Sequence, residues 1–166
     1  MLGKLKSSPL KVGSPAPDFV LSDQNGESID LKDALTAGPV VVYFYPKAFT
    51  TVCTAEACGF RDSHDDFAEA GATVIGISRD TVQTQRKFDA KHGLNHLLLS
   101  DPDGKVHAAF GVRSGGGGAG FVLNDRITFV IDGDGMVRGQ FGGLMQADPH
   151  VRESLELVKR LAADAR

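Results

Sequence analysis

Two cysteines, Cys53 and Cys58, are the residues of this 166-residue chain whose type and spacing most directly suggest chemistry. They lie five positions apart, so a structural disulfide between them would close a very short loop and constrain the unfolded chain little. In a reducing compartment, paired thiols more often act in catalysis or bind a metal than stabilise a fold. The pair therefore directs attention to redox chemistry, nucleophilic catalysis or a metal site.

The segment before Cys53 predicts how its sulfur is positioned. Residues 39–45 are mostly β-branched or aromatic, which is typical of a strand buried on both faces. Pro46 ends this strand, and a helix is predicted from about Thr51 to Ala70, with Gly71 as its C-terminal stop. Cys53 then falls in the first turn, where free amide hydrogens and the helix dipole stabilise a thiolate.

Ionisation of the thiol alone does not make a fast enzyme. An ordinary thiol with a pKa near 8.5 is about 3% thiolate at pH 7, so complete ionisation gains only about 30-fold. Fast chemistry also needs donors aimed at the charge that develops in the transition state. The candidates are Thr50, just before Cys53, and Arg126, at the start of a predicted strand. Glu56 either complements the helix N-terminus or orients an arginine.

Plainer interpretations exist for the same residues. The two cysteines could be small buried apolar side chains. A zinc site that recruits His64 would have an unusually wide cysteine spacing and would lack a fourth ligand. Thr50 could serve only as a helix N-cap, and Arg126 could be a simple charge at a strand edge.

The rest of the chain predicts a single α/β domain with a mixed central sheet flanked by helices, because strands alternate with helices before a final hairpin and helix. Residues 1–12 are expected to form a loosely held arm. The elements expected after the cysteine segment are a strand over Val74–Ser78, a helix over Thr81–His92, a strand over Leu97–Leu99, a hairpin of Ile127–Ile131 and Met136–Phe141, and a closing amphipathic helix over Val151–Ala163.

Composition argues against two classes of partner. Eighteen Lys and Arg residues against 21 Asp and Glu residues give a net charge of −3, whereas a nucleic-acid-binding protein is usually basic. The longest strongly apolar run, Val40–Tyr45, is far shorter than the roughly 20 residues of a membrane span. The N-terminus has no apolar stretch of signal-peptide length, so a cytoplasmic location is expected. The segment 114–120 is glycine-rich and predicts a flexible loop; it lacks the pattern of a phosphate-binding loop.

Three segments resemble one known family. Pro46, Thr50 and Cys53 match the P-x-x-x-T-x-x-C pattern of peroxiredoxins, and Cys58 has the spacing of the bacterioferritin comigratory protein (PrxQ) subfamily. Residues 13–19 resemble the N-terminal segment of that subfamily. Residues 126–132 resemble its later strand with the active-site arginine, and the similarity covers roughly residues 9–165. The chain departs from the common pattern at positions 51 and 52, where Pro-Gly is frequent.

The resemblance implies a thioredoxin-like fold and thiol peroxidase activity on hydrogen peroxide and organic hydroperoxides. Cys53 would attack the peroxide and become a sulfenic acid. Cys58 would then form a disulfide with Cys53, and thioredoxin or a similar dithiol would reduce it. Catalysis would also involve Thr50, Arg126 and Pro46, with no cofactor or metal, in a monomer or weak dimer. The alternatives are a general thiol-disulfide oxidoreductase, which usually has C-x-x-C, or a redox sensor on the same fold.

Helix geometry adds an expectation that is independent of family. In an intact α-helix, residues five apart have Cα atoms nearly 9 Å apart, whereas a disulfide needs less than about 7 Å. Gly59 weakens the helix beside Cys58 by about 1 kcal/mol relative to alanine. We therefore expect oxidation to unwind the first turns of the helix that carries both cysteines.

Overall fold

The computed structural model describes residues 9–112, 126–142 and 148–164, which form a seven-stranded mixed sheet in the order β2-β1-β5-β4-β3-β6-β7. The strands are β1 (Val20–Ser22), β2 (Ser28–Asp30), β3 (Val40–Phe44), β4 (Thr73–Ser78), β5 (Leu97–Ser100), β6 (Ile127–Ile131) and β7 (Val137–Gly142). The helices are α1 (Leu31–Leu35), α2 (Thr51–Asp62), α3 (His64–Glu69), α4 (Val82–His92), α5 (Lys105–Ala109) and α6 (Asp148–Asp164).

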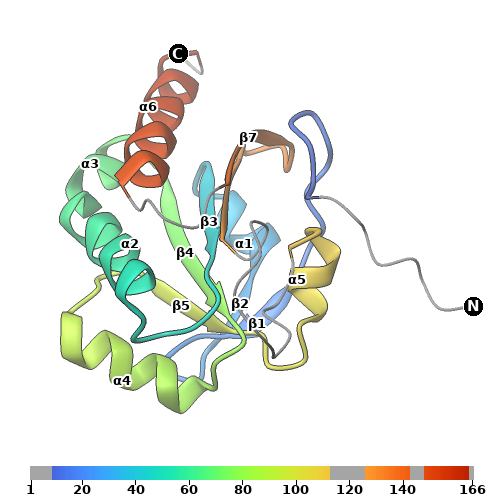
Figure 1. The fold of residues 1–166 in the computed structure, drawn as a ribbon. Helices are drawn as coiled ribbons and strands as arrows, with labels where there is room; N and C mark the ends of the chain where they lie inside the picture. Colours follow the sequence, from blue (N-terminus) through green and yellow to red (C-terminus); the bar gives the residue numbers. More distant parts are fainter. Residues whose placement is uncertain (1–8, 113–125, 143–147, 165–166) are drawn as a thin grey trace, which may run out of the picture.

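Helices cover both faces of the sheet. Helices α2, α3, α4 and α6 lie on one side, and α1 and α5 lie on the other (Figure 1). Each face has its own apolar cluster, because alternate residues of the central strands point to opposite sides. The predicted α/β fold with a mixed central sheet is confirmed. None of the described helices is long and apolar enough to cross a membrane.

The centre of the sheet fixes where the ends of its strands meet. Strand β3 is buried along its whole length, pairs in parallel with β4, and pairs antiparallel with β6. In the β3–β6 register, Phe44 at the end of β3 faces Ile127 at the start of β6. Arg126, which precedes β6, is therefore brought to the edge of the sheet from which the chain leaves β3 toward α2.

The prediction of one helix from about Thr51 to Ala70 is wrong, because the chain forms two helices separated by Ser63. Ser63 has φ −98° and ψ 11°, and its amide donates to the carbonyl of Gly59 at 3.1 Å. Phe60 and Phe67 both face the same apolar cluster, with ring centroids 5.6 Å apart. Their seven-residue spacing fits a continuous helix equally well, so the periodicity could not reveal the break.

The first described residues are attached to the body of the protein. Leu10 is buried, its amide donates to the carbonyl of Phe110 at 3.1 Å, and its carbonyl accepts from Gln140 Nε2 at 2.7 Å. Gly13 donates its amide to the carbonyl of Val137 at 2.8 Å. The loosely held arm expected over residues 1–12 therefore does not extend over Leu10. Residues 1–8 of that arm and the glycine-rich segment 114–120 lie outside the described residues.

Candidate active site

Cys53 lies in the first turn of α2, in the position that the sequence predicts, and its side chain is fully buried. Nη2 of Arg126 donates a hydrogen bond to its sulfur at 3.0 Å. Arg126 is itself only 3% exposed, so its positive charge acts on the sulfur in a site largely closed to water. The guanidinium therefore lies where it can donate to negative charge on the sulfur during reaction.

Glu56 lies one turn after Cys53 and holds the same arginine. Its Oε1 accepts a hydrogen bond from Nη1 of Arg126 at 3.0 Å, and its side chain is fully buried. Burial raises the pKa of Glu56 to about 7, although the charge and hydrogen bond of Arg126 oppose that rise. The guanidinium thus bridges a buried carboxyl group and the buried sulfur, which fixes the direction of its remaining donors.

His150 and Thr128 extend this cluster, and sequence reasoning missed both. Nδ1 of His150 lies 3.3 Å from the second oxygen of Glu56, Oε2, and 2.8 Å from Oγ1 of Thr128. Both residues are buried, Thr128 within β6 and His150 in the first turn of α6. The available sequence signals are a threonine inside an apolar strand and a histidine next to the apolar face of the closing helix.

Thr50 and Pro46 belong to the loop that connects β3 to α2. Thr50 occupies the N-cap position, but its hydroxyl donates to the carbonyl of Lys47 at 2.8 Å and does not cap the helix. Its own carbonyl accepts the first helical hydrogen bond, from the amide of Thr54 at 2.9 Å. Pro46 and Thr50 are both half-buried. The hydroxyl of Thr50, three residues before Cys53, is therefore hydrogen-bonded within the loop.

The same loop contains a strained backbone position at Phe49. This residue has φ 67°, a region that bulky side chains rarely adopt, and its side chain remains 45% exposed. Its ring packs against Phe88 at a centroid distance of 5.1 Å, with Nζ of Lys91 at 5.9 Å. The neighbouring Ala48 amide is fixed by Oδ2 of Asp80 at 2.8 Å. The loop is therefore held in one shape while it presents an aromatic ring at the start of α2.

Cys58 lies on the same helix as Cys53, and both cysteines are free. Its half-buried side chain packs against the apolar cluster beneath α2. Because α2 is continuous from Thr51 to Asp62, helix geometry keeps the two Cα atoms nearly 9 Å apart. The structure therefore shows a reduced arrangement in which the two sulfurs cannot bond without a change in the helix.

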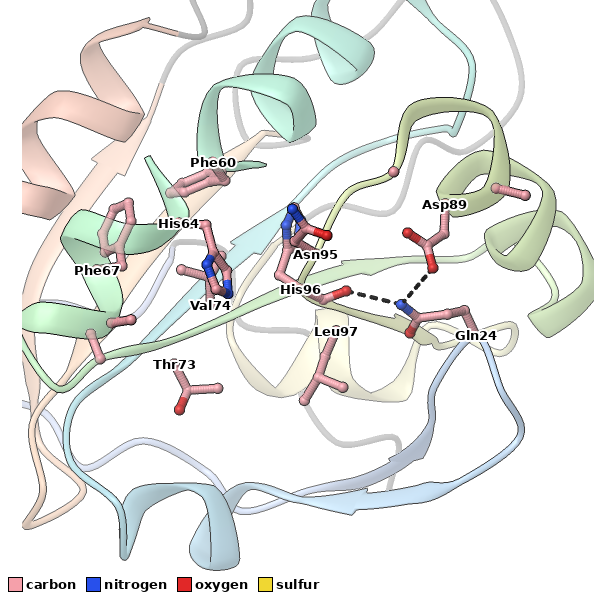
Figure 2. Close-up of a pocket in the computed structure, with 14 residues that line it drawn as sticks. Gln24, Phe60, His64, Phe67, Thr73, Val74, Asp89, Asn95, His96 and Leu97 are labelled. Carbon is pink, nitrogen blue, oxygen red and sulfur yellow. Dashed lines mark hydrogen bonds between the residues drawn. The ribbon is translucent and has the colours of Figure 1, made fainter. Parts of the chain in front are cut away.

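A pocket of about 680 Å³ lies away from this cluster, between α3, α4 and the first residues of β4 and β5 (Figure 2). Several of its polar groups bind one another: Nε2 of Gln24 donates to Oδ2 of Asp89 at 3.3 Å and to the carbonyl of His96 at 2.9 Å. Burial lowers the pKa of His96 to about 4, and its Nε2 lies 2.6 Å from the hydroxyl of Tyr43. Cys53 does not line the pocket.

Sequence comparison places the chain among known proteins. Residues 12–140 match the AhpC/TSA family. Peroxiredoxin Q, chloroplastic, of Suaeda salsa is 42% identical over 149 residues, which cover 90% of this chain and 68% of that protein. Peroxiredoxin Bcp of Escherichia coli (strain K12) is 42% identical over 145 residues, which cover 86% of this chain and 92% of that protein.

Solved structures agree with the sequence comparison. Peroxidoxin BcpB from Mycobacterium tuberculosis superposes with a TM-score of 0.82 and 39% identity, covering 92% of this chain and 98% of that one. Peroxiredoxin Q from Xanthomonas campestris superposes with a TM-score of 0.78 and 30% identity, covering 94% and 99%. With the free cysteine pair in α2 and the arginine at the buried sulfur, these matches show that the chain belongs to the AhpC/TSA family, in its peroxiredoxin Q/Bcp group, and is a thiol peroxidase.

Proposed function

We propose that the thiolate of Cys53 attacks the terminal oxygen of a hydroperoxide. A sulfur–oxygen bond forms as the oxygen–oxygen bond breaks, so that the sulfur loses two electrons and the peroxide gains them. The leaving oxygen takes a proton and departs as water or an alcohol, and Cys53 becomes a sulfenic acid. The observation that carries this proposal is the guanidinium of Arg126 at 3.0 Å from the sulfur, where it also stabilises charge on the leaving oxygen.

The surrounding residues have distinct roles in this proposal. Glu56 fixes the orientation of Arg126 through its 3.0 Å hydrogen bond. Thr50 and Pro46 shape the approach to Cys53 from the β3–α2 loop, and both are half-buried beside the start of the helix. On peroxide binding, the hydroxyl of Thr50 exchanges the carbonyl of Lys47 for an oxygen of the peroxide.

Cys58 completes the cycle as the resolving cysteine. After α2 unwinds locally, the thiolate of Cys58 attacks the sulfur of the sulfenic acid. A Cys53–Cys58 disulfide forms as the sulfur–oxygen bond breaks, and the departing hydroxide takes up the proton that the Cys58 thiol released and leaves as water. Thioredoxin, or a similar dithiol, then reduces this disulfide by thiol–disulfide exchange. Because both cysteines lie in one chain, the cycle requires no second subunit, which supports a monomer or weak dimer. A reducing compartment such as the cytoplasm suits this final exchange.

Both hydrogen peroxide and organic hydroperoxides are proposed as substrates. Alkyl peroxide reduction activity is attributed to the bacterioferritin comigratory protein of Xanthomonas campestris, a solved structure that is 30% identical to this chain. In this chain, the exposed ring of Phe49 lies four residues before Cys53 and offers apolar surface to an alkyl group. Its backbone is held in an uncommon conformation, so this surface is already in place before the substrate arrives.

Mass spectrometry after one equivalent of peroxide tests the proposal. The wild-type chain should lose two hydrogen atoms, and the bond should map to Cys53 and Cys58. A Cys58→Ser variant should gain one oxygen on Cys53 at an unchanged rate, but thioredoxin-dependent turnover should fall at least about 100-fold because no disulfide forms.

The control is Cys53→Ser, which should consume no peroxide. Peroxide consumption by Cys53→Ser at the wild-type rate would exclude Cys53 as the nucleophile. Full thioredoxin-dependent turnover by Cys58→Ser would exclude the resolving role of Cys58. A general thiol-disulfide oxidoreductase would instead reduce disulfide substrates efficiently without peroxide, so an insulin-reduction assay separates that alternative.

A further inference from the structure

Helix α6 touches α2 at two places within the first described turn of α6. Nδ1 of His150 lies 3.3 Å from Oε2 of Glu56. The next residue, Val151, packs so closely on Gly59 that a Cβ added to the glycine would lie 3.0 Å from Cγ2 of the valine. The absence of a side chain at Gly59 therefore allows α6 to approach α2 at the height of Glu56, and this approach brings the imidazole to the carboxyl group.

From this contact we infer that His150 is a positioning residue for the reaction of Cys53 with peroxide. Its imidazole, anchored by Thr128, lies within ion-pair distance of Oε2 of Glu56, an oxygen that accepts no hydrogen bond, while Oε1 accepts from the guanidinium of Arg126 at the sulfur. The inference rests on the proposed role of Cys53 as the nucleophile.

The distances form one continuous path. Oγ1 of Thr128 lies 2.8 Å from Nδ1 of His150, which lies 3.3 Å from Oε2 of Glu56. Oε1 of Glu56 accepts from Arg126 at 3.0 Å, and Arg126 donates to Cys53 at 3.0 Å. All five side chains are at most 3% exposed. In such a water-poor site each polar contact is stronger than in water, and the loss of one member leaves its partner poorly satisfied.

Two contacts fix the orientation of a carboxyl group more completely than one contact does. A carboxyl group held only through Oε1 can rotate about that hydrogen bond, and the plane of the guanidinium can turn with it. A second contact at Oε2 fixes the plane of the carboxyl group and therefore the direction in which Nη2 of Arg126 points. Outer partners of this kind commonly change affinity or rate by about 10- to 100-fold when they are removed from metal sites.

The protonation of Glu56 depends on the groups that face it. Among the described residues these are Arg126 before β6, His150 on α6, Tyr43 on β3, and Cys53 on the same helix as Glu56. The pKa of Glu56 is raised to about 7 by burial, against the opposing charge and hydrogen bond of Arg126. We expect loss of the imidazole 3.3 Å from Oε2 to disfavour the ionised carboxylate, so that its pairing with Arg126 weakens at neutral pH.

Two substitutions of His150 distinguish positioning from packing. His150→Asn keeps a nitrogen donor close to the place of Nδ1, whereas His150→Leu keeps a similar volume without any donor. Both are made in the Cys58→Ser background, so that only the step at Cys53 is observed. Because the chain has no tryptophan, rapid-quench mass spectrometry of sulfenic acid formation between about pH 5.5 and 9 is the readout.

We expect His150→Leu to lower the second-order rate constant at pH 7 about 10-fold. We also expect the acid side of its pH–rate profile to shift to higher pH. The rate constant of His150→Asn should stay within about threefold of that of the parent, and the acid side of its pH–rate profile should lie at nearly the same pH. Thr128→Val keeps the imidazole but removes its anchor. It should lower the rate and shift the acid side of the profile to higher pH, as His150→Leu does, but by a smaller amount. This variant decides the question if His150→Leu does not fold by circular dichroism.

Three results would overturn the inference. The first is a folded His150→Leu protein with the rate and pH profile of its parent. The second is an equal loss of rate in His150→Asn and His150→Leu with the pH profile unchanged, which indicates packing alone. The third, when His150→Leu fails to fold, is a Thr128→Val protein identical to the parent. Failure of the Cys58→Ser parent itself to form sulfenic acid would instead contradict the proposed function.

Discussion

Glu56 shows how a single side chain changes character between sequence and structure. In the sequence it is an acidic residue one turn into a helix, a position that usually lies in water and complements the helix dipole. In the structure it is fully buried, pairs with Arg126, and has its pKa raised to about 7 by burial. Its carboxyl group therefore titrates close to neutral pH beside the sulfur that does the chemistry.

The raised pKa of Glu56 predicts a pH dependence of stability. Glu56 releases its proton near pH 4.5 in the unfolded chain and near pH 7 in the folded protein. Its contribution to the free energy of unfolding is therefore fully present below about pH 4.5 and is lost as the pH rises through 7. Glu56→Gln cannot titrate. We expect the free energy of unfolding of the wild type, relative to that of Glu56→Gln, to fall by about 3 kcal/mol between pH 4.5 and 8.

Urea unfolding of both proteins under reducing conditions measures this difference. Parallel pH curves for the two proteins would contradict the prediction. A difference that grows as the pH rises would show that the pKa of Glu56 is lowered rather than raised.

The candidate site was partly readable from the sequence. Local signals indicate a cysteine at the start of a helix and make Arg126, at the start of a predicted strand, a candidate donor, and the structure has its guanidinium at the sulfur. Thr128 and His150 could not be found in this way. Their contacts depend on the angle at which α6 crosses the sheet and α2, which is set by packing between distant parts of the chain.

At the scale of elements, the proposed cycle requires α2 to be both stable and able to open. Its first turns hold Cys53 and Glu56, and its third turn holds Cys58 and Gly59. A glycine inside a helix costs about 1 kcal/mol relative to alanine, and this one also allows Val151 to approach closely. The same residue thus allows the close contact of α2 with α6 and lowers the cost of unwinding the helix beside Cys58.

This role of Gly59 predicts the speed of disulfide formation. Because alanine at this position would press on Val151, the comparison is made between Val151→Ala and the double variant Gly59→Ala/Val151→Ala. The double variant should form the Cys53–Cys58 disulfide about fivefold more slowly, since its helix is about 1 kcal/mol harder to unwind. Rapid quenching with an alkylating agent after one equivalent of peroxide measures the rate. Equal rates in the two variants would show that unwinding does not limit the step.

The elements themselves were largely predictable, and the exceptions have physical causes. The β-branched strands β3 and β6 follow from local composition. The break at Ser63 does not, because Phe60 and Phe67 keep a helical spacing across it. The attachment of Leu10 depends on a contact with Phe110, 100 residues along the chain, which no local pattern indicates.

In the whole molecule, the chemistry is confined to one face of the sheet. Cys53, Cys58 and Phe60 belong to the cluster beneath α2, α3, α4 and α6. The opposite cluster, with Phe44, Phe110 and Phe129, is separated from them by the central strands. A rearrangement of α2 therefore leaves half of the core untouched.

This separation predicts where the oxidised protein loosens. Hydrogen exchange of the disulfide form should be faster over residues 50–62 and in the first described turn of α6, which packs on them through Val151. Exchange in β3, β6 and α5 should not change. The reduced wild type and peroxide-treated Cys58→Ser, which carries an oxidised Cys53 but no bridge, are the controls. A uniform increase across the chain would show global destabilisation instead.

Complete burial of the Cys53 sulfur in the folded helix has a consequence for selectivity. We therefore expect a small oxidant to reach the sulfur far more readily than a bulky one such as glutathione disulfide. The thiol is thus shielded from the abundant mixed disulfides of the cell for as long as the helix stays closed. Under the proposed cycle, α2 opens only after Cys53 has been oxidised, and the sulfur then becomes accessible to a large protein reductant.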